Sequence, residues 1–304
     1  MNRKSMFLLV LFGSGIAWGS TQTLGKIAVS SGHRHFGLIF WQLAIGAILL
    51  GAVTLIQRKS VPLNRATLGF SGIVALIGTI IPNSAFYYAV AHLPAGIMSI
   101  IISTVPLLSF PIALALGMDR FSAARLAGLL CGLGGVALIA LPQSSLPEAG
   151  MAAFIPIALL GPLFYACESN FVAWRGMAGM QALQAMFLTS VVGAALTLPL
   201  AVFSGQWINP VAGFGPPEQA LVASAIVHAL AYSAYLWLAS QAGAVFAAQS
   251  GYIVTATGVV WAMLVLGETY SGWVWAALVL MLFGLTLVQP RDTTTAPGLA
   301  KENL

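Results

Sequence analysis

The sequence predicts an all-α integral membrane protein in which ten transmembrane helices form two inverted five-helix repeats. Three observations support this fold class: a nearly uncharged composition, ten apolar windows of spanning length, and landmark residues that recur in both halves of the chain. Only 6% of the 304 residues are charged, and 59% are hydrophobic. Soluble domains carry about 25% charged residues, so this composition excludes a soluble protein with a water-facing surface.

The apolar windows place the helices in order along the chain. A helix needs about 20 apolar residues to cross a bilayer. Such windows cover residues 6–29, 37–57, 66–91, 95–117, 123–142, 151–173, 181–204, 217–240, 244–266 and 272–289. We expect the first window to be a span and not a cleaved signal peptide, because Gln22 and Lys26 replace a small-residue cleavage site. The short connectors favour antiparallel neighbours.

The lysines and arginines predict how the chain is oriented in the membrane. With the N-terminus inside, ten basic residues fall on the cytoplasmic side, and only Lys26 and Arg34 fall outside. The inner set is Arg3, Lys4, Arg58, Lys59, Arg65, Arg120, Arg125, Arg175, Arg291 and Lys301. Basic residues prefer cytoplasmic connectors, so we expect both termini in the cytoplasm of a bacterial-type cell with a cytoplasmic (inner) membrane. The net charge of +5 then reflects membrane topology and not a nucleic-acid partner.

Landmark residues recur at the same spacing in both halves. Residues 88–96 join the third and fourth windows, and residues 235–243 join the eighth and ninth; both stretches begin with Tyr and end with Ala-Gly. After each stretch, an apolar helix ends in Leu-x-Leu-Gly, at 114–117 and at 264–267. A shared order of landmarks is the signature of an internal repeat.

The odd number of helices in each repeat determines how the repeats are related. We assign residues 1–145 to the first repeat, 151–290 to the second, and 291–304 to a cytoplasmic tail. Five crossings leave the chain on the opposite side of the membrane, so the second repeat enters inverted. Inverted repeats around a midplane site are the architecture of alternating-access carriers. The sequence therefore predicts a transporter and not an enzyme.

Four short segments carry a resemblance to a known family: Ala17-Trp18-Gly19-Ser20, residues 88–96, Pro106 and residues 264–268. Through them the chain resembles the EamA-type, ten-helix branch of the drug/metabolite transporter superfamily over residues 6–290. One departure is Gly117-Met118-Asp119, where the second half has Gly-Glu. The resemblance implies a carrier, and it extends to the YddG-like aromatic amino acid exporters. Members of this branch differ more in substrate than in fold.

The expected function is that of a secondary exporter of small organic metabolites, with aromatic or other hydrophobic amino acids as the leading substrate class. Carriers of drugs, nucleosides or sugars are the alternative within the same superfamily. The expected partners are the substrate and membrane lipid, and the chain is expected to be a monomer, with a dimer as the alternative. No cofactor or metal is expected, and Cys131 and Cys167 lie in different windows. The choice between uniport and proton antiport stays open.

Polar and aromatic side chains inside the apolar windows mark the predicted substrate site. Polar groups within spans tend to face the bundle interior or a wet cavity, and helical spacing places several of them on shared faces. The candidate substrate-binding residues are Trp18, Gln22, Asn83, Tyr87, Tyr165, Glu168, His228, Tyr232, Tyr235, Gln249 and Tyr252. For Asn83 and Gln22, a hydrogen bond to a neighbouring helix is an equal alternative.

Three ionisable side chains fall within the predicted spans. Lys26 lies near the outer end of the first helix and is expected to extend to the interface. Glu168 is a candidate proton carrier or partner for a substrate ammonium group, with a structural hydrogen bond as the alternative. His228 either titrates near neutrality or stays neutral beside a tyrosine.

An intramembrane serine protease is the rival prediction. Gly69-Phe70-Ser71-Gly72 matches the Gly-x-Ser-Gly of rhomboid-like enzymes, and His228 would be the base. We expect Ser71 near the inner end of its helix and His228 near the midplane, which keeps the two apart.

Glycines and prolines predict where helices pack closely or bend. Gly128, Gly132 and Gly135 share one face of the fifth window, which favours close packing within the monomer, with dimerisation as the alternative. A further set, Pro82, Pro106 and Pro162, lies inside windows, as hinges or as tolerated kinks.

Overall fold

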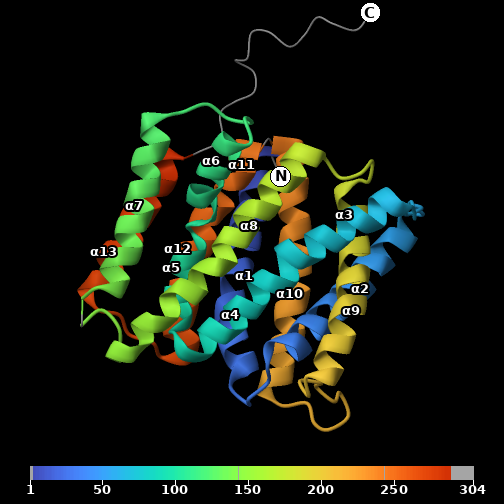
Figure 1. The fold of residues 1–304 in the computed structure, drawn as a ribbon, viewed down its shortest axis with the longest axis horizontal. Helices are drawn as coiled ribbons and strands as arrows, with labels where there is room; N and C mark the ends of the chain where they lie inside the picture. Colours follow the sequence, from blue (N-terminus) through green and yellow to red (C-terminus); the bar gives the residue numbers. More distant parts are fainter. Residues whose placement is uncertain (1–2, 143, 243, 289–304) are drawn as a thin grey trace, which may run out of the picture.

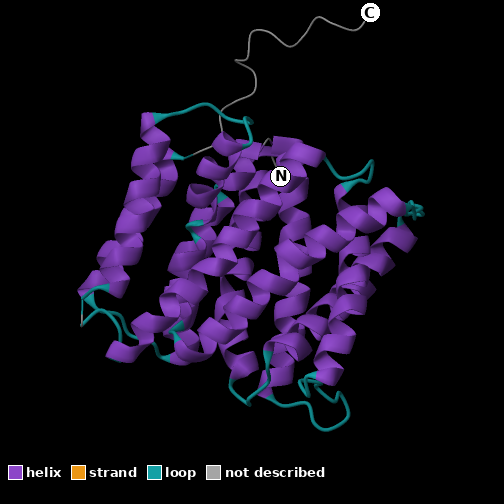
Figure 2. Cartoon of the chain, viewed as in Figure 1, coloured by secondary structure: helices purple, strands orange, loops and turns teal. Residues whose placement is uncertain are grey.

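The computed structural model describes residues 3–142, 144–242 and 244–288, and these residues form helices and connecting loops (Figure 1, Figure 2). The first half contains α1 (Arg3–Val29), α2 (His35–Ile56), α3 (Arg65–Ala75), the π-helix η1 (Leu76–Ile80), α4 (Ile81–His92), α5 (Ala95–Ile102), α6 (Val105–Ala115) and α7 (Ala123–Ala140). The second half contains the 3₁₀-helix η2 (Ala149–Phe154), α8 (Ile155–Arg175), α9 (Ala182–Phe203), α10 (Pro216–Ala242), α11 (Ala244–Ala248), α12 (Ser250–Leu266) and α13 (Gly272–Leu287).

These elements combine into ten helical segments, as the apolar windows predict. In the described ranges, 8 segments are long and apolar enough to cross a membrane, among them the composite segments Arg65–His92 and Ala95–Ala115. The ninth segment is α10, with 27 residues, and the tenth is the shorter apolar helix α13. An all-helical membrane domain is what lipid demands, because helices satisfy their own backbone hydrogen bonds.

The two repeats run in opposite directions through the bundle. Figure 1 shows that α1 begins at the face near the label N and runs to the opposite face, whereas α8 runs the other way. We call the face where α1 begins and α13 ends the terminal face, and the opposite one the far face. The described basic residues follow the predicted division, because Lys26 and Arg34 belong to the far face and the others to the terminal face. The tail residues Arg291 and Lys301 lie outside the described residues.

Each repeat surrounds the first helix of the other. Helix α1 packs against α10 and α12 of the second half, and α8 packs against α4 and α6 of the first half. Two further pairs, α2 with α9 and α7 with α13, flank this central group (Figure 1). The core between the repeats is therefore built by residues far apart in the sequence.

The glycine face of α7 packs within the monomer, as predicted. A Cβ atom on Gly128 would lie 2.7 Å from the carbonyl oxygen of Gly284, and one on Gly284 would lie 2.8 Å from that of Gly128. A Cβ on Gly135 would meet Met281 of α13, and one on Gly132 would meet Leu107 of α6. Gly128, Gly135 and Gly284 need glycine because the backbones of α7 and α13 approach closely.

Two of the predicted windows contain helix interruptions that periodicity does not reveal. Pro82 has no N–H to donate to the carbonyl of Gly78, so the α-helical pattern cannot continue there, and the π-helix η1 precedes it. In the next window, α5 ends before Ser103 and Thr104, whose hydroxyls donate to carbonyls one turn back, and Pro106 opens α6. Pro162, in contrast, lies inside the continuous helix α8.

The membrane orientation remains a prediction with a direct test. In a background in which Cys131 and Cys167 are replaced by alanine, cysteines at Ser31 and Ala212 should react with an impermeant thiol reagent in intact cells. Both residues are exposed on far-face connectors. Ala212 is preferable to Gly205, because Gly205 has φ +69° and would be strained by a side chain. A cysteine at Lys59, on the terminal face, should react only in permeabilised cells. Labelling of Lys59→Cys in intact cells would show that the orientation is the reverse of the predicted one.

Candidate functional site

Four rings from the two repeats meet near the middle of the bundle, and we call them the aromatic cluster: Trp18 of α1 with His228, Tyr232 and Tyr235 of α10. The ring centroid of Trp18 lies 5.8 Å from His228, 6.0 Å from Tyr232 and 6.3 Å from Tyr235, each in an edge-to-face arrangement. The rings of His228 and Tyr232 are nearly parallel, with centroids 6.4 Å apart. All four side chains are partly buried. The helical stripe predicted from the sequence thus faces the first repeat.

A second group, the polar cluster, joins three helices through hydrogen bonds. The side-chain amide of Asn83 on α4 donates to Oε1 of Gln42 on α2 at 3.2 Å, and the Tyr87 hydroxyl donates to the same oxygen at 3.1 Å. The Tyr165 hydroxyl of α8 donates to Oδ1 of Asn83 at 2.6 Å. For Asn83, the structure therefore shows the interhelical hydrogen bonds that were one of its two predicted roles. Sequence reasoning missed Gln42, whose only signal is one amide in an apolar window.

Glu168 of α8 lies between the two clusters. Its carboxylate rests on the backbone of Gly78 in η1, where an added Cβ would lie 2.5 Å from Oε1 and 2.8 Å from Oε2. The carboxylate also interacts electrostatically with the hydroxyls of Tyr165 in the polar cluster and Tyr232 in the aromatic cluster. In the part of the chain that the structure describes, the salt bridges are those of other residues, His33 with Glu218 and Arg125 with Asp119.

Two predicted site residues, Gln22 and Gln249, lie apart from these contacts. Gln22 is partly buried about one turn beyond Trp18, and no hydrogen bond joins its side chain to another described residue. Gln249 is exposed at the interruption between α11 and α12, where its backbone carbonyl accepts from the N–H of Tyr252. The hydrogen bonds and ring contacts described above for the aromatic and polar clusters do not include Gln249, and Tyr252 follows it in the first turn of α12.

The far face carries a set of helix caps that the sequence did not predict, which we call the far-face clasp. Lys26 Nζ donates to the carbonyls of Ala91 and Leu93, at 3.2 and 3.0 Å, at the end of α4. The Lys26 ammonium group thus caps the end of α4 on the far face, because carbonyls left free at a helix end attract a cation. The carboxylate of Glu268 accepts from the N–H groups of Ala95 and Gly96, at 2.8 and 3.1 Å, at the start of α5.

Tyr270 completes the far-face clasp. Its hydroxyl donates to Oε2 of Glu268 at 2.5 Å, and it lies against Gly96, where a Cβ would collide with it. Partial burial and the hydrogen bond to Glu268 raise the pKa of the Tyr270 phenol above its usual range. The phenol therefore stays protonated and remains a donor at physiological pH. Glu268 of the second repeat thus caps the N-terminus of α5 in the first repeat.

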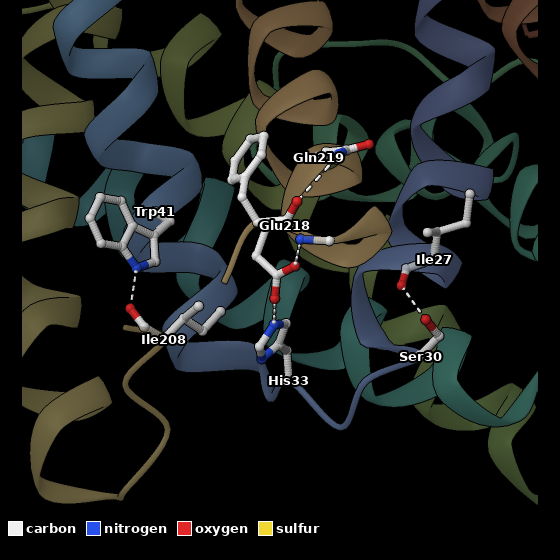
Figure 3. A network of polar contacts seen from close by, with 9 residues as sticks. Ile27, Ser30, His33, Trp41, Ile208, Glu218 and Gln219 are labelled. Carbon is white, nitrogen blue, oxygen red and sulfur yellow. Dashed lines mark hydrogen bonds and ion pairs between the residues drawn. The ribbon is translucent and has the colours of Figure 1, made fainter. Parts of the chain in front are cut away.

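A further contact on the far face joins the connector after α1 to the first turn of α10 (Figure 3). His33 Nε2 and Glu218 Oε1 are 2.6 Å apart, and the second carboxylate oxygen of Glu218 accepts from the N–H of Gly215 at 2.8 Å. Nearby, the indole N–H of Trp41 donates to the carbonyl of Ile208 at 3.0 Å. A surface pocket of about 360 Å³ lies beside His33 and Glu218.

Several fully buried side chains lie on the far side of the two clusters. Leu38, Ile39, Val90, Leu93 and Ile97 are fully buried, at 0% exposure, and all belong to helix ends that approach the far face. Together with the far-face clasp, these contacts join the two repeats at the far face.

Comparison with known proteins identifies the protein. The sequence model of the EamA-like transporter family matches residues 5–141 and 153–289, one copy in each half. The chain belongs to the EamA-like transporter family. Membership places this EamA-like transporter in the drug/metabolite transporter superfamily. The chain is a membrane transporter and not an enzyme.

Further comparisons concern the fold of this EamA-like transporter. It is similar to a solved structure described as "Crystal structure of protein", with a TM-score of 0.65 and 20% identity, covering 93% of this chain and 96% of that chain. At this identity the similarity shows the fold alone. No curated protein matches the chain.

The rival protease prediction is also excluded by the site geometry. Ser71 is fully buried, and its hydroxyl has no hydrogen-bond partner among the described residues. His228 instead belongs to the aromatic cluster with Trp18. A serine nucleophile needs its base within hydrogen-bond reach, and this pair does not provide it.

Proposed function

We propose that this EamA-like transporter exports small organic metabolites, foremost amino acids with aromatic or hydrophobic side chains, across a bacterial cytoplasmic membrane. The observation that carries the proposal is the aromatic cluster, in which Trp18 of one repeat meets three rings of the other. Substrate sites of inverted-repeat carriers lie at the repeat interface near the midplane.

The chemistry of the two clusters supports such a substrate. Aromatic rings in edge-to-face geometry bind another ring with about 0.5–1.5 kcal/mol beyond burial, so Trp18 and Tyr232 suit an apolar or aromatic side chain. Beside them, Asn83 and Tyr165 offer amide and hydroxyl groups. Apolar sites with a few fixed polar groups are typical of small-molecule binding. The substrate and lipid are the partners we propose, with the monomer as the working unit.

Alternating access would involve the contacts at the far face. If the terminal face is cytoplasmic, as the basic residues predict, the far-face contacts lie on the outer side of the membrane. Export would then require the far face to open, which separates the two segments joined by His33 and Glu218. Flux through such a cycle needs no nucleotide.

Replacing Tyr232 with alanine tests the proposal. Loss of one aromatic contact worth about 1–1.5 kcal/mol should weaken transport about tenfold, while membrane insertion survives. The assay is counterflow of labelled phenylalanine in proteoliposomes, with unlabelled amino acids, nucleosides, sugars and drugs as competitors. Phe283→Ala is the control, because Phe283 of α13 is 55% exposed on the outer surface of the bundle.

Two outcomes would contradict the proposal. Wild-type counterflow by Tyr232→Ala at normal expression would mean that this face of α10 packs without contacting substrate. Competition by nucleosides or sugars, with none by amino acids, would assign the aromatic cluster to another substrate class of the superfamily, since rings also stack on nucleobases.

A further inference from the structure

We infer that Glu168, seated on Gly78, is the binding site for the ammonium group of the substrate, an inference that rests on the proposed function. It makes the transporter selective for primary amines and assigns Gly78 as a specificity-determining residue. The argument uses the fit of Glu168 against η1, the charge around it, and its place between the two clusters.

In its observed position, the Glu168 carboxylate occupies the space that a Cβ at position 78 would take, so a side chain there would displace it. A Cβ at Gly78 would lie 2.5 Å from Oε1 and 2.8 Å from Oε2 of Glu168, closer than side-chain atoms can approach. The seat is part of the π-helix Leu76–Ile80, which Pro82 imposes by withholding an N–H from the Gly78 carbonyl. Single π-helical turns inside α-helices are frequent at functional sites.

The charge around Glu168 leaves a place for a cation. The Glu168 carboxylate interacts electrostatically with Tyr165 and Tyr232, and the described salt bridges all involve other residues. An ionised carboxylate inside a membrane protein is costly unless a partner neutralises it. The substrate itself can be that partner, because an ammonium group brings one positive charge and three donors.

The surroundings favour an organic ammonium over a metal ion. No group of three or more His, Cys, Asp or Glu side chains that could hold a metal occurs among the described residues, and hard cations require six or more oxygen ligands. Aromatic faces, in contrast, attract organic cations, and Tyr232 links the carboxylate to the aromatic cluster. An amino acid can therefore place its ammonium group on Glu168 and its side chain near Trp18 and Tyr232.

Competition by matched analogues tests the inference. In counterflow of labelled phenylalanine, 2-phenylethylamine should compete with the wild type, whereas 3-phenylpropionate, which lacks the amine, should not. Glu168→Gln keeps the shape and removes the charge, so the apparent affinity for phenylalanine should fall at least about 30-fold, and the preference for the amine should vanish. Gly78→Ala should displace the carboxylate, and it should therefore also lower the apparent affinity for phenylalanine and weaken the preference for the amine.

The control variant is Gly72→Ala, one helix turn and a half before Gly78, where an added Cβ meets nothing within 4 Å. It should keep the wild-type affinity and amine preference. If Gly78→Ala does not fold, Glu168→Gln alone tests the inference, because the side chains of Glu and Gln have nearly the same volume.

The outcomes separate this inference from the proposed function. Unchanged amine preference in Glu168→Gln overturns the inference and leaves amino acid transport standing. Unchanged counterflow with loss of uptake driven by a pH gradient would make Glu168 a proton carrier only, which also overturns it. Competition by amines of other classes, with none by amino acids, supports the ammonium site and rejects the proposed substrate.

Discussion

Glu268→Ala is expected to destabilise the folded transporter by about 3 kcal/mol or more. The Glu268 carboxylate accepts from the N–H groups of Ala95 and Gly96 and from the Tyr270 hydroxyl. Hydrogen bonds to a charged group contribute about 1.5–3 kcal/mol each. Removing the carboxylate also leaves two N–H groups without a partner at the buried start of α5, where the helix dipole adds to the loss.

Thermal unfolding in detergent measures this effect. Glu268→Gln retains an acceptor oxygen but no charge, so its midpoint should lie between the wild type and Glu268→Ala. The matched control is Glu148→Ala, because Glu148 is exposed on the same face of the protein. An unfolding midpoint of Glu268→Ala equal to that of Glu148→Ala would mean that the far-face clasp contributes nothing to stability.

Gly128→Ala should destabilise the protein by about 1–3 kcal/mol, the usual cost of overpacking. The added Cβ would lie 2.7 Å from the carbonyl oxygen of Gly284 and against Val288 and Leu287, so α7 and α13 must move apart. The same substitution at Gly13 of α1 meets nothing within 4 Å. There it should be neutral or stabilising by up to about 1 kcal/mol, because alanine favours the helix over glycine.

The comparison of Gly128→Ala with Gly13→Ala therefore predicts opposite signs for one chemical change. Unfolding midpoints of both variants, measured in the same detergent, test this prediction. Equal midpoints would show that the backbones of α7 and α13 have room to separate, and that the glycine face is not required for their packing.

The helical segments could be predicted from the sequence because lipid imposes a simple rule. Each span must be apolar and about 20 residues long, and its backbone must satisfy its own hydrogen bonds. The interruptions at η1 and after α5 follow a different rule, since Pro82 and Pro106 break local hydrogen bonding within windows that remain apolar throughout. A hydropathy average over each window therefore does not detect these interruptions.

The candidate site could be predicted only where it follows a single helix. His228, Tyr232 and Tyr235 share one face of α10 by spacing alone, and the structure places them against Trp18. Gln42 and Gly78 escaped prediction because their partners, Asn83 and Glu168, lie on other helices. The helix position of a side chain can be derived from periodicity, whereas the neighbour it meets depends on tertiary packing.

The first helix of each repeat packs among helices of the other repeat, and this arrangement has a consequence for biogenesis. Gly15 and Gly19 of α1 are shaped for close contact with Ile253 and Thr257 of α12, a helix that leaves the ribosome more than two hundred residues later. Until then, the nascent first half holds this small-residue surface without its native neighbour. The two halves therefore cannot mature one after the other as independent units. Completion of the central bundle is a late step, coupled to insertion of the second half by the translocon.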